Sequence, residues 1–171
     1  MAARDVLAED SAASLNVIAE RAQVHRVTVF RHFPTREALI TALHNAWLDD
    51  AEAAVLETDP EADDLLREIE ALIRRVYQVQ LQWRTYGWAP GYSSHTPERQ
   101  RRQHVGELTI ALFAAAQQQG LLRQDLSLAG LLAAWAGPVI YLSGNIADGN
   151  WTLDAVVEHT MLLITPQARA S

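Results

Sequence analysis

Apolar side chains recur at helical spacing, every third or fourth residue, from the first residues to about position 164. No segment shows the alternation of a strand, so this pattern restricts the chain to an all-helical fold. Proline, glycine and short polar runs divide it into segments. It predicts helices over residues 2–9, 15–22, 26–32, 36–47, 63–83, 97–120, 128–146 and 153–164.

Local start and stop signals support these segments. Ser14 and Thr35 are suited to cap the second and fourth helices, because a hydroxyl can accept from free amide groups of a first turn. Asp63 and Asp64 stand where carboxylates favour a helix dipole. We expect a tight break after Gln23, and a kink at Pro138 in the helix over 128–146.

The second and third segments form a candidate helix-turn-helix. Ala19 is small enough for two helices to cross closely, and an apolar wedge is expected from Ile18, Ala22, Val24, Val29 and Phe33. The residues left on the outside of the third segment are Arg26, Thr28, Arg31 and His32, which suit phosphates and base edges. On this pattern alone, DNA binding and an ordinary helical hairpin with a solvated face remain equal alternatives.

The run from Ile18 to Leu39 resembles the DNA-binding signature of tetracycline-repressor (TetR) family regulators along its whole length. The Ile-Ala pair at 18–19, Thr28 followed closely by an aromatic residue, His32-Phe33, and a basic residue at Arg36 carry the resemblance. It implies a helix-turn-helix DNA-binding domain over 1–47, with the fourth helix as connector. An all-helical effector-binding and dimerisation domain would follow over 48–171.

The resemblance also implies roles for single residues. Arg26 and Thr28 would read base edges in the major groove, with Val27 against a thymine methyl or a sugar. Asn16 would reach a base or phosphate. Backbone contacts are expected from His25, Phe30, Arg31, His32 and Arg36.

The chain departs from the family pattern at three of its motif positions. Gln23 replaces the usual turn glycine, at a cost on the order of 1 kcal/mol if its backbone is left-handed. His25 replaces the usual serine cap, and Phe30 replaces the commoner tyrosine, so that a hydroxyl suited to a phosphate is lost. The first helix is also shorter than is usual in the family.

Charge and composition are compatible with DNA binding at one end of the molecule. The net charge of −7 lies entirely after Trp47, because the segment before it has equal numbers of arginines and acidic residues. The longest apolar stretch, 128–142, is shorter than the roughly 20 residues that cross a bilayer. There is no cysteine, and we find no nucleophile–base pair, phosphate loop or metal motif. We therefore expect a cytoplasmic non-enzyme without a cofactor.

Aromatic residues in the second domain predict an effector site. Packing explains most aromatics at helical spacing, but Trp88 and Tyr92 lie in a loop-like stretch. We expect a small hydrophobic or aromatic ligand in a cavity lined by Tyr77, Trp83, Trp88, Tyr92, His104 and Trp135. A metal between His95 and His104 is disfavoured, because these residues have neither the spacing of a metal site nor a carboxylate partner.

The helix over 128–146 is apolar on nearly every side and contains Ala133, Ala134, Ala136 and Gly137, which permit close approach. The last helix has an apolar stripe made of Val156, Val157, Thr160, Leu163 and Ile164. We expect these two helices to form a four-helix interface in a homodimer. The alternative is that the first of them is simply the buried central helix of the domain.

Together these features predict a dimeric repressor that binds a palindromic operator in double-stranded DNA and is released by a ligand. The alternative is a helical ligand-binding or interaction protein that has lost DNA binding.

Overall fold

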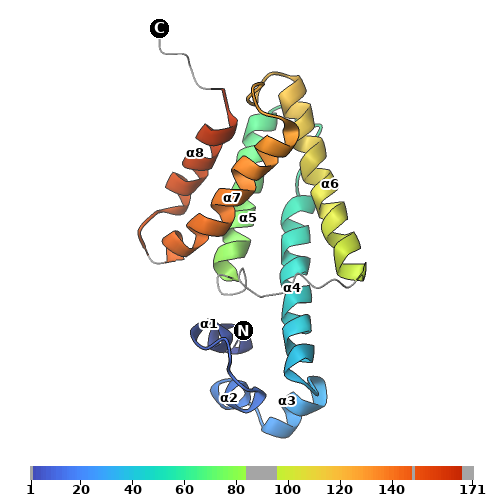
Figure 1. Cartoon of the computed structure of the whole chain (residues 1–171), viewed down its shortest axis with the longest axis vertical. Coiled ribbons are helices and arrows are strands. Elements are labelled where there is room, and N and C mark those ends of the chain that lie inside the picture. The colour runs from blue at the N-terminus through green and yellow to red at the C-terminus, as the bar shows by residue number, and fades with distance from the viewer. Residues whose placement is uncertain (1, 84–95, 148, 167–171) are drawn as a thin grey trace.

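The computed structural model describes residues 2–83, 96–147 and 149–166; the side chains of 2, 8, 96–102, 104–105, 140–145 and 147 are left out of this description. Every regular element in these ranges is a helix, which confirms the all-helical fold (Figure 1). The helices are α1 (Ala2–Glu9), α2 (Leu15–Arg21), α3 (Arg26–His32), α4 (Arg36–Leu56), α5 (Leu65–Gln82), α6 (Thr96–Gln118), α7 (Leu128–Ala147) and α8 (Leu153–Ile164).

Side-chain caps start α2 and α4 where the sequence predicts, and a cap starts α5 at Leu65, two residues later than predicted. The Ser14 hydroxyl accepts from the Val17 amide at 3.4 Å, and the Thr35 hydroxyl accepts from the Ala38 amide at 3.1 Å. The Asp64 carboxylate accepts from the Arg67 amide at 3.0 Å. Each cap satisfies an amide that has no partner within its helix, so local sequence determines where the helix begins.

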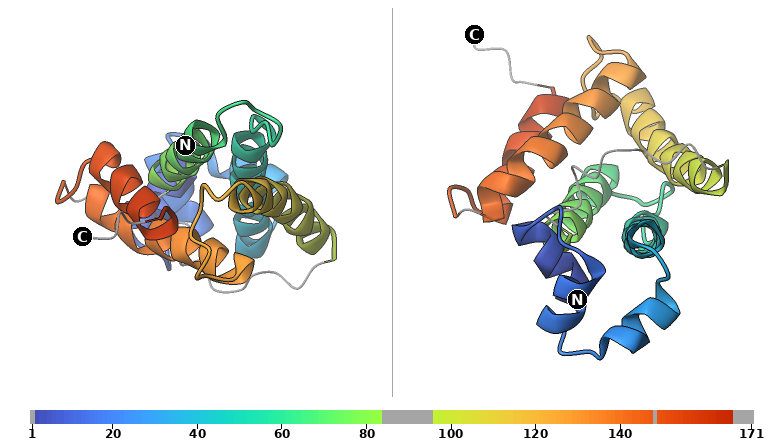
Figure 2. Two further views of the ribbon diagram at one scale, coloured as in Figure 1. Left: turned by 90° about the horizontal axis from the view of Figure 1, so that it is seen from above. Right: turned by 60° about the horizontal axis from the view of Figure 1, so that its bottom comes forward.

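The helices form a small head and a larger body that share α4 (Figures 1 and 2). In the head, α1–α3 enclose an apolar cluster that includes Val6, Ile18 and, from α4, Leu39. In the body, the core of α5–α8 includes Val55 from the far end of α4. The boundary expected after Trp47 falls inside α4, which continues without interruption from head to body.

The body is built around α5, whose buried face packs against α4, α6, α7 and α8. Ile69, Leu72 and Ile73 are fully buried there. Leu131, Trp135 and Val139 of α7 face this core. A second face of α7 is left exposed, at Ala129, Ala133 and Gly137. The inner face of α7 therefore matches the alternative of a buried central helix, and the contact surface for a second chain stays a prediction for the exposed face.

The expected stripe of α8 is mostly used inside the chain, which corrects the sequence prediction. Val156, Val157, Thr160 and Ile164 are buried in the body core, and of the five residues only Leu163 is exposed. Periodicity identifies an apolar face but not the chain against which it packs, and this face packs on α7 and α5 of its own chain. The exposed apolar surface of α8 consists of the neighbours Leu162 and Leu163.

A buried hydrogen bond joins α5 to α8 within the core. The Tyr77 and Thr160 side-chain oxygens are 3.1 Å apart, and the Thr160 hydroxyl donates to the Val156 carbonyl at 2.8 Å. Because a threonine hydroxyl has one hydrogen, Tyr77 must be the donor of the first bond. Burial raises the pKa of the Tyr77 phenol.

Tyr77→Phe should lower the free energy of unfolding by about 0.5–1.5 kcal/mol, because it removes one net hydrogen bond and leaves the ring in place. A double-mutant cycle with Thr160→Val, measured by urea denaturation, should show coupling between the two changes; strict additivity would contradict the bond.

The raised pKa of Tyr77 means that the neutral phenol is favoured in the folded state. The contribution of the buried neutral phenol to the free energy of unfolding should be complete below about pH 10, the ordinary tyrosine pKa. This contribution should decline as the pH rises through the folded pKa.

No helix within the described ranges is both long and apolar enough to span a membrane.

Candidate nucleic-acid interface

The turn between α2 and α3 has the geometry of a tight helix-turn-helix. Gln23 is left-handed, with φ of 54°, and is the only non-glycine residue with positive φ in the described chain. Its amide donates to the Glu20 carbonyl at 3.0 Å, and the Val24 amide donates to the Ala19 carbonyl at 3.0 Å. The break expected at Gln23 is therefore confirmed, together with the backbone conformation that normally favours glycine.

Gln23→Gly should stabilise the protein by about 0.5–1 kcal/mol, because the Cβ strain it relieves exceeds the entropy that glycine adds to the unfolded chain. The thermal midpoint should rise by about 1–4 °C in a protein of this size. Gln23→Ala is the matched control, because alanine keeps the Cβ atom and should give no gain. Equal midpoints for the glycine and alanine variants would show that the turn is unstrained.

Apolar contacts hold α2 and α3 at this angle. Ile18 and Ala19 are buried, and Val29 of α3 and Phe33 directly after α3 pack against the head cluster. Val24, which we expected in the wedge, is instead 41% exposed at the turn. The reversal of the chain at Gln23 directs the next side chain outward, which periodicity within one helix cannot predict.

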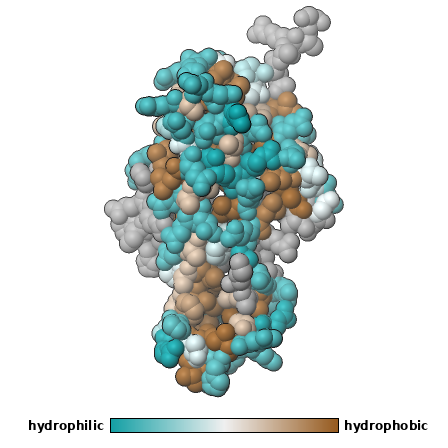
Figure 3. Space-filling model, turned by 180° about the vertical axis from the view of Figure 1, so that it is seen from behind, coloured by the Kyte–Doolittle hydropathy of each residue, from teal (hydrophilic) through white to brown (hydrophobic). Residues whose placement is uncertain are grey.

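The outer surface of the head presents most of the predicted DNA contacts. Asn16 on α2, His25 before α3, and Arg26, Val27, Phe30, Arg31 and His32 on α3 are exposed. Thr28 is half-buried, so it projects less than Arg26 and Val27. Val27 is 65% exposed, which is unusual for an apolar residue and suits contact with a thymine methyl group. Hydrophobic surface is visible on the head in the space-filling view from behind (Figure 3).

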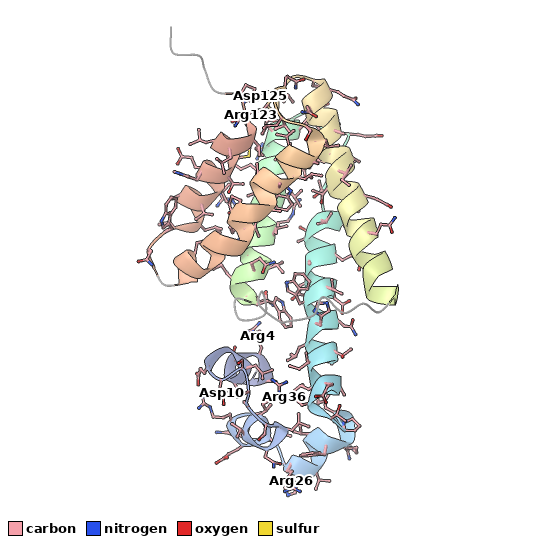
Figure 4. The ribbon with its side chains drawn as sticks, viewed as in Figure 1. Arg4, Asp10, Arg26, Arg36, Arg123 and Asp125 are labelled. Carbon is pink, nitrogen blue, oxygen red and sulfur yellow. The ribbon has the colours of Figure 1, made fainter. Side chains whose placement is uncertain are left out.

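Two side chains of this surface are held in place by their neighbours. The Arg26 guanidinium carbon lies 5.5 Å from the centre of the Phe30 ring, a cation–π distance. His25 caps α3, since its Nδ1 accepts from the Val27 amide at 3.4 Å. The His25 imidazole therefore caps α3, at the position where the sequence has histidine in place of serine. Arg26 points away from the body at the lower end of the molecule (Figure 4).

Arg36, expected to bind a phosphate, has partners inside the head. Its Nε donates to the Ala13 carbonyl at 3.3 Å, and its Nη2 donates to the Ser11 carbonyl. These bonds attach the loop between α1 and α2 to the first turn of α4. A guanidinium has five N–H donors, so the phosphate contact stays a prediction beside this structural role.

The expected effector residues separate in the structure. Trp88 and Tyr92, and the side chain of His104, lie outside the described part of the chain. Tyr77 is in the core, and Trp135 packs on Phe113 with ring centres 5.9 Å apart. Trp83 is buried, and its Nε1 donates to Asp50 at 2.7 Å. These contacts give Tyr77, Trp83 and Trp135 packing roles that aromatic spacing alone could not distinguish from lining a cavity.

A hollow of about 300 Å³ lies between α4 and α5, and none of the predicted effector residues lines it. Its walls include Asp50, Glu57, Arg75 and Gln78. Sequence reasoning missed these polar residues, because single charges on amphipathic helices give no signal of a shared site. No cluster of three or more potential metal ligands occurs among the described residues.

Apolar contacts hold two short helices together, and their outer face presents arginine, histidine and exposed valine. This arrangement defines a helix-turn-helix DNA-binding protein. Residues 2–43, which span this unit, match the family model described as bacterial regulatory proteins of the tetR family. This unit of the chain is therefore similar to the DNA-binding domain of TetR family regulators.

Solved structures share the fold over nearly the whole chain. The ketosteroid transcriptional regulator KstR2 of Mycobacterium tuberculosis has a TM-score of 0.80 at 15% identity, covering 97% of this chain and 92% of its own. PfmR, a TetR family regulator from Thermus thermophilus, also gives 0.80 at 15% identity, covering 99% and 95%. AibR in complex with isovaleryl coenzyme A and operator DNA gives 0.79 at 16% identity, covering 98% and 96%. A comparison with curated protein sequences finds no match.

Proposed function

We propose that this protein is a homodimeric repressor that binds a palindromic operator and releases it when a small molecule binds the body. The observation that carries the proposal is the exposed face of α3, where Arg26, Val27 and Arg31 project together from a clamped helix-turn-helix. We assign its site of action to the cytoplasm and a regulatory rather than an enzymatic role.

The proposed dimer uses the outer faces of α7 and α8, which lie side by side along one edge of the body (Figures 1 and 2). Ala129, Ala133 and Gly137 of α7 are exposed at intervals of four residues and permit close helix approach. Leu162 and Leu163 are 47% and 41% exposed on α8. A two-fold axis beside these helices would bury both sets of residues in a four-helix interface.

The proposed effector is a small hydrophobic molecule. One relative by fold, a ketosteroid transcriptional regulator, supports this class; another was solved with isovaleryl coenzyme A, of which only the acyl group is small and apolar. Trp88, Tyr92 and His104 remain the predicted lining of the site. Tyr77, Trp83 and Trp135 support it only indirectly, because each already has partners within the fold.

Binding to DNA fragments tests the proposal. A gel-shift screen with fragments from the region upstream of the protein's own gene should give one retarded complex. Its affinity should fall steeply with salt as counterions are released from phosphates. Failure of the folded protein to retard any fragment, at low salt included, would favour the alternative of an interaction protein without DNA binding.

A further inference from the structure

The head touches the body at a place other than α4. Arg4 of α1 is only 16% exposed, and its guanidinium carbon lies 5.3 Å from the centre of the Trp83 ring. Figure 4 shows Arg4 on the side of α1 that faces the body. Since α1 otherwise packs within the head, this contact is a second attachment between the two parts.

Trp83 is itself fixed by α4. It is the residue that ends α5 and is 7% exposed. Its indole Nε1 donates to the Asp50 carboxylate at 2.7 Å, and the side-chain amide of the neighbouring Gln82 donates to the same oxygen at 3.3 Å. A short bond from a buried indole to a carboxylate fixes the ring plane on which Arg4 lies.

The charges in this contact are complementary. Arg4 contributes a cation to the face of the ring, and Asp50 contributes an anion at its N–H edge. The indole N–H is the positive end of the ring dipole and the ring face is negative, so both neighbours are attracted. Arg4 is largely removed from water, which makes a cation–π contact stronger than on an open surface.

We propose that Arg4, Trp83 and Asp50 position the head on the body and so set the orientation of the recognition helix α3. The proposal rests on the proposed function for its consequence, the spacing of the two recognition helices in a dimer. A single helix, α4, would leave the head able to twist and bend about it. The second contact, from α1 to the end of α5, restricts that motion and gives a shift of α5 a direct route to the head.

This assignment gives Trp83 a role different from the one its sequence suggests. It is a positioning residue, acting through Arg4, rather than part of the effector site. Because α5 forms the middle of the body core, a rearrangement of that core would move Trp83 relative to Asp50 on α4.

The distance between head and body can be measured directly, since the chain contains no cysteine and two introduced ones are labelled uniquely. Arg31→Cys on α3 and Gln118→Cys at the end of α6 place spin labels at exposed positions in the two parts. Dilution of labelled protein with unlabelled protein leaves only the distance within one chain. Pulsed electron paramagnetic resonance should give a narrow distribution of distances between the two spin labels. This distribution should become broad when Arg4→Met is added.

Trp83→Phe, which keeps a ring but removes the N–H donor, should broaden the distribution less than Arg4→Met. The matched control is Arg21→Met, which removes another head arginine, one paired with Glu9 inside the head. The control should leave the distribution narrow. Unchanged distributions in both the Arg4 and Trp83 variants would overturn the proposal, whether or not the protein binds DNA.

Operator binding gives a second, separate readout. The wild-type protein should bind an operator with the natural half-site spacing about ten times more tightly than an operator with an extra base pair. Arg4→Met should show a much smaller difference in affinity between the two operators. Binding to a single half-site should be equal in the two proteins. If the wild-type protein binds no DNA, the proposed function fails while the distance measurement still decides the positioning role. Full discrimination by Arg4→Met would overturn that role.

Discussion

Ala133→Arg should convert the dimer into monomers and abolish tight operator binding. Ala133 is exposed in the single chain, on the face of α7 that the proposed two-fold axis would bury. Arginine there would bring two unpaired guanidinium groups into an apolar interface. Burying such charges costs about 4 kcal/mol or more, which weakens association about a thousandfold.

The matched control for this change is Ala111→Arg. Ala111 is also exposed within a long helix, but on α6, which lies on the other side of the body from α8 (Figures 1 and 2). Both substitutions place a good helix former on solvent-facing helix surface and should leave the monomer folded. Light scattering at micromolar concentration should show a dimer for the wild type and Ala111→Arg, and a monomer for Ala133→Arg. A dimeric Ala133→Arg variant would exclude this interface.

Arg26→Ala should lower affinity for the specific operator by about 1–3 kcal/mol, roughly 5-fold to 150-fold, while non-specific DNA binding changes little. Arg26 is exposed on the first turn of α3 and rests on the Phe30 ring, which orders its guanidinium before DNA binds. An ordered, planar donor group is suited to two hydrogen bonds with a guanine edge.

Arg67→Ala is the control for charge alone, because Arg67 is an exposed arginine on α5 in the body. It should leave both specific and non-specific affinities close to those of the wild type. Titrations of specific and random duplexes at several salt concentrations separate the two effects. An equal loss on both duplexes in Arg26→Ala would identify Arg26 as a phosphate anchor rather than a reader of bases.

Much of this fold could be predicted from the sequence because its determinants are local. Ser14, Thr35 and Asp64 cap helices through bonds that span three residues, so their positions fix where α2, α4 and α5 begin. The position of the turn at Gln23 is also local, whereas its left-handed backbone was established by the structure. The helix-turn-helix and the exposed face of α3 are predictable for this reason.

Tertiary structure alone decided which partner each apolar or charged side chain would meet. The stripe of α8 is apolar whether it packs within its own chain or on a second chain, and most of it is buried against α7 and α5 of its own chain. Arg36 carries the same charge whether it binds a phosphate or the carbonyls of Ser11 and Ala13. Trp83 became a contact between head and body because folding placed Asp50 and Arg4 beside it, from helices distant in the sequence. Periodicity determines which face of a helix avoids water, but only the packing of all the helices determines what that face touches.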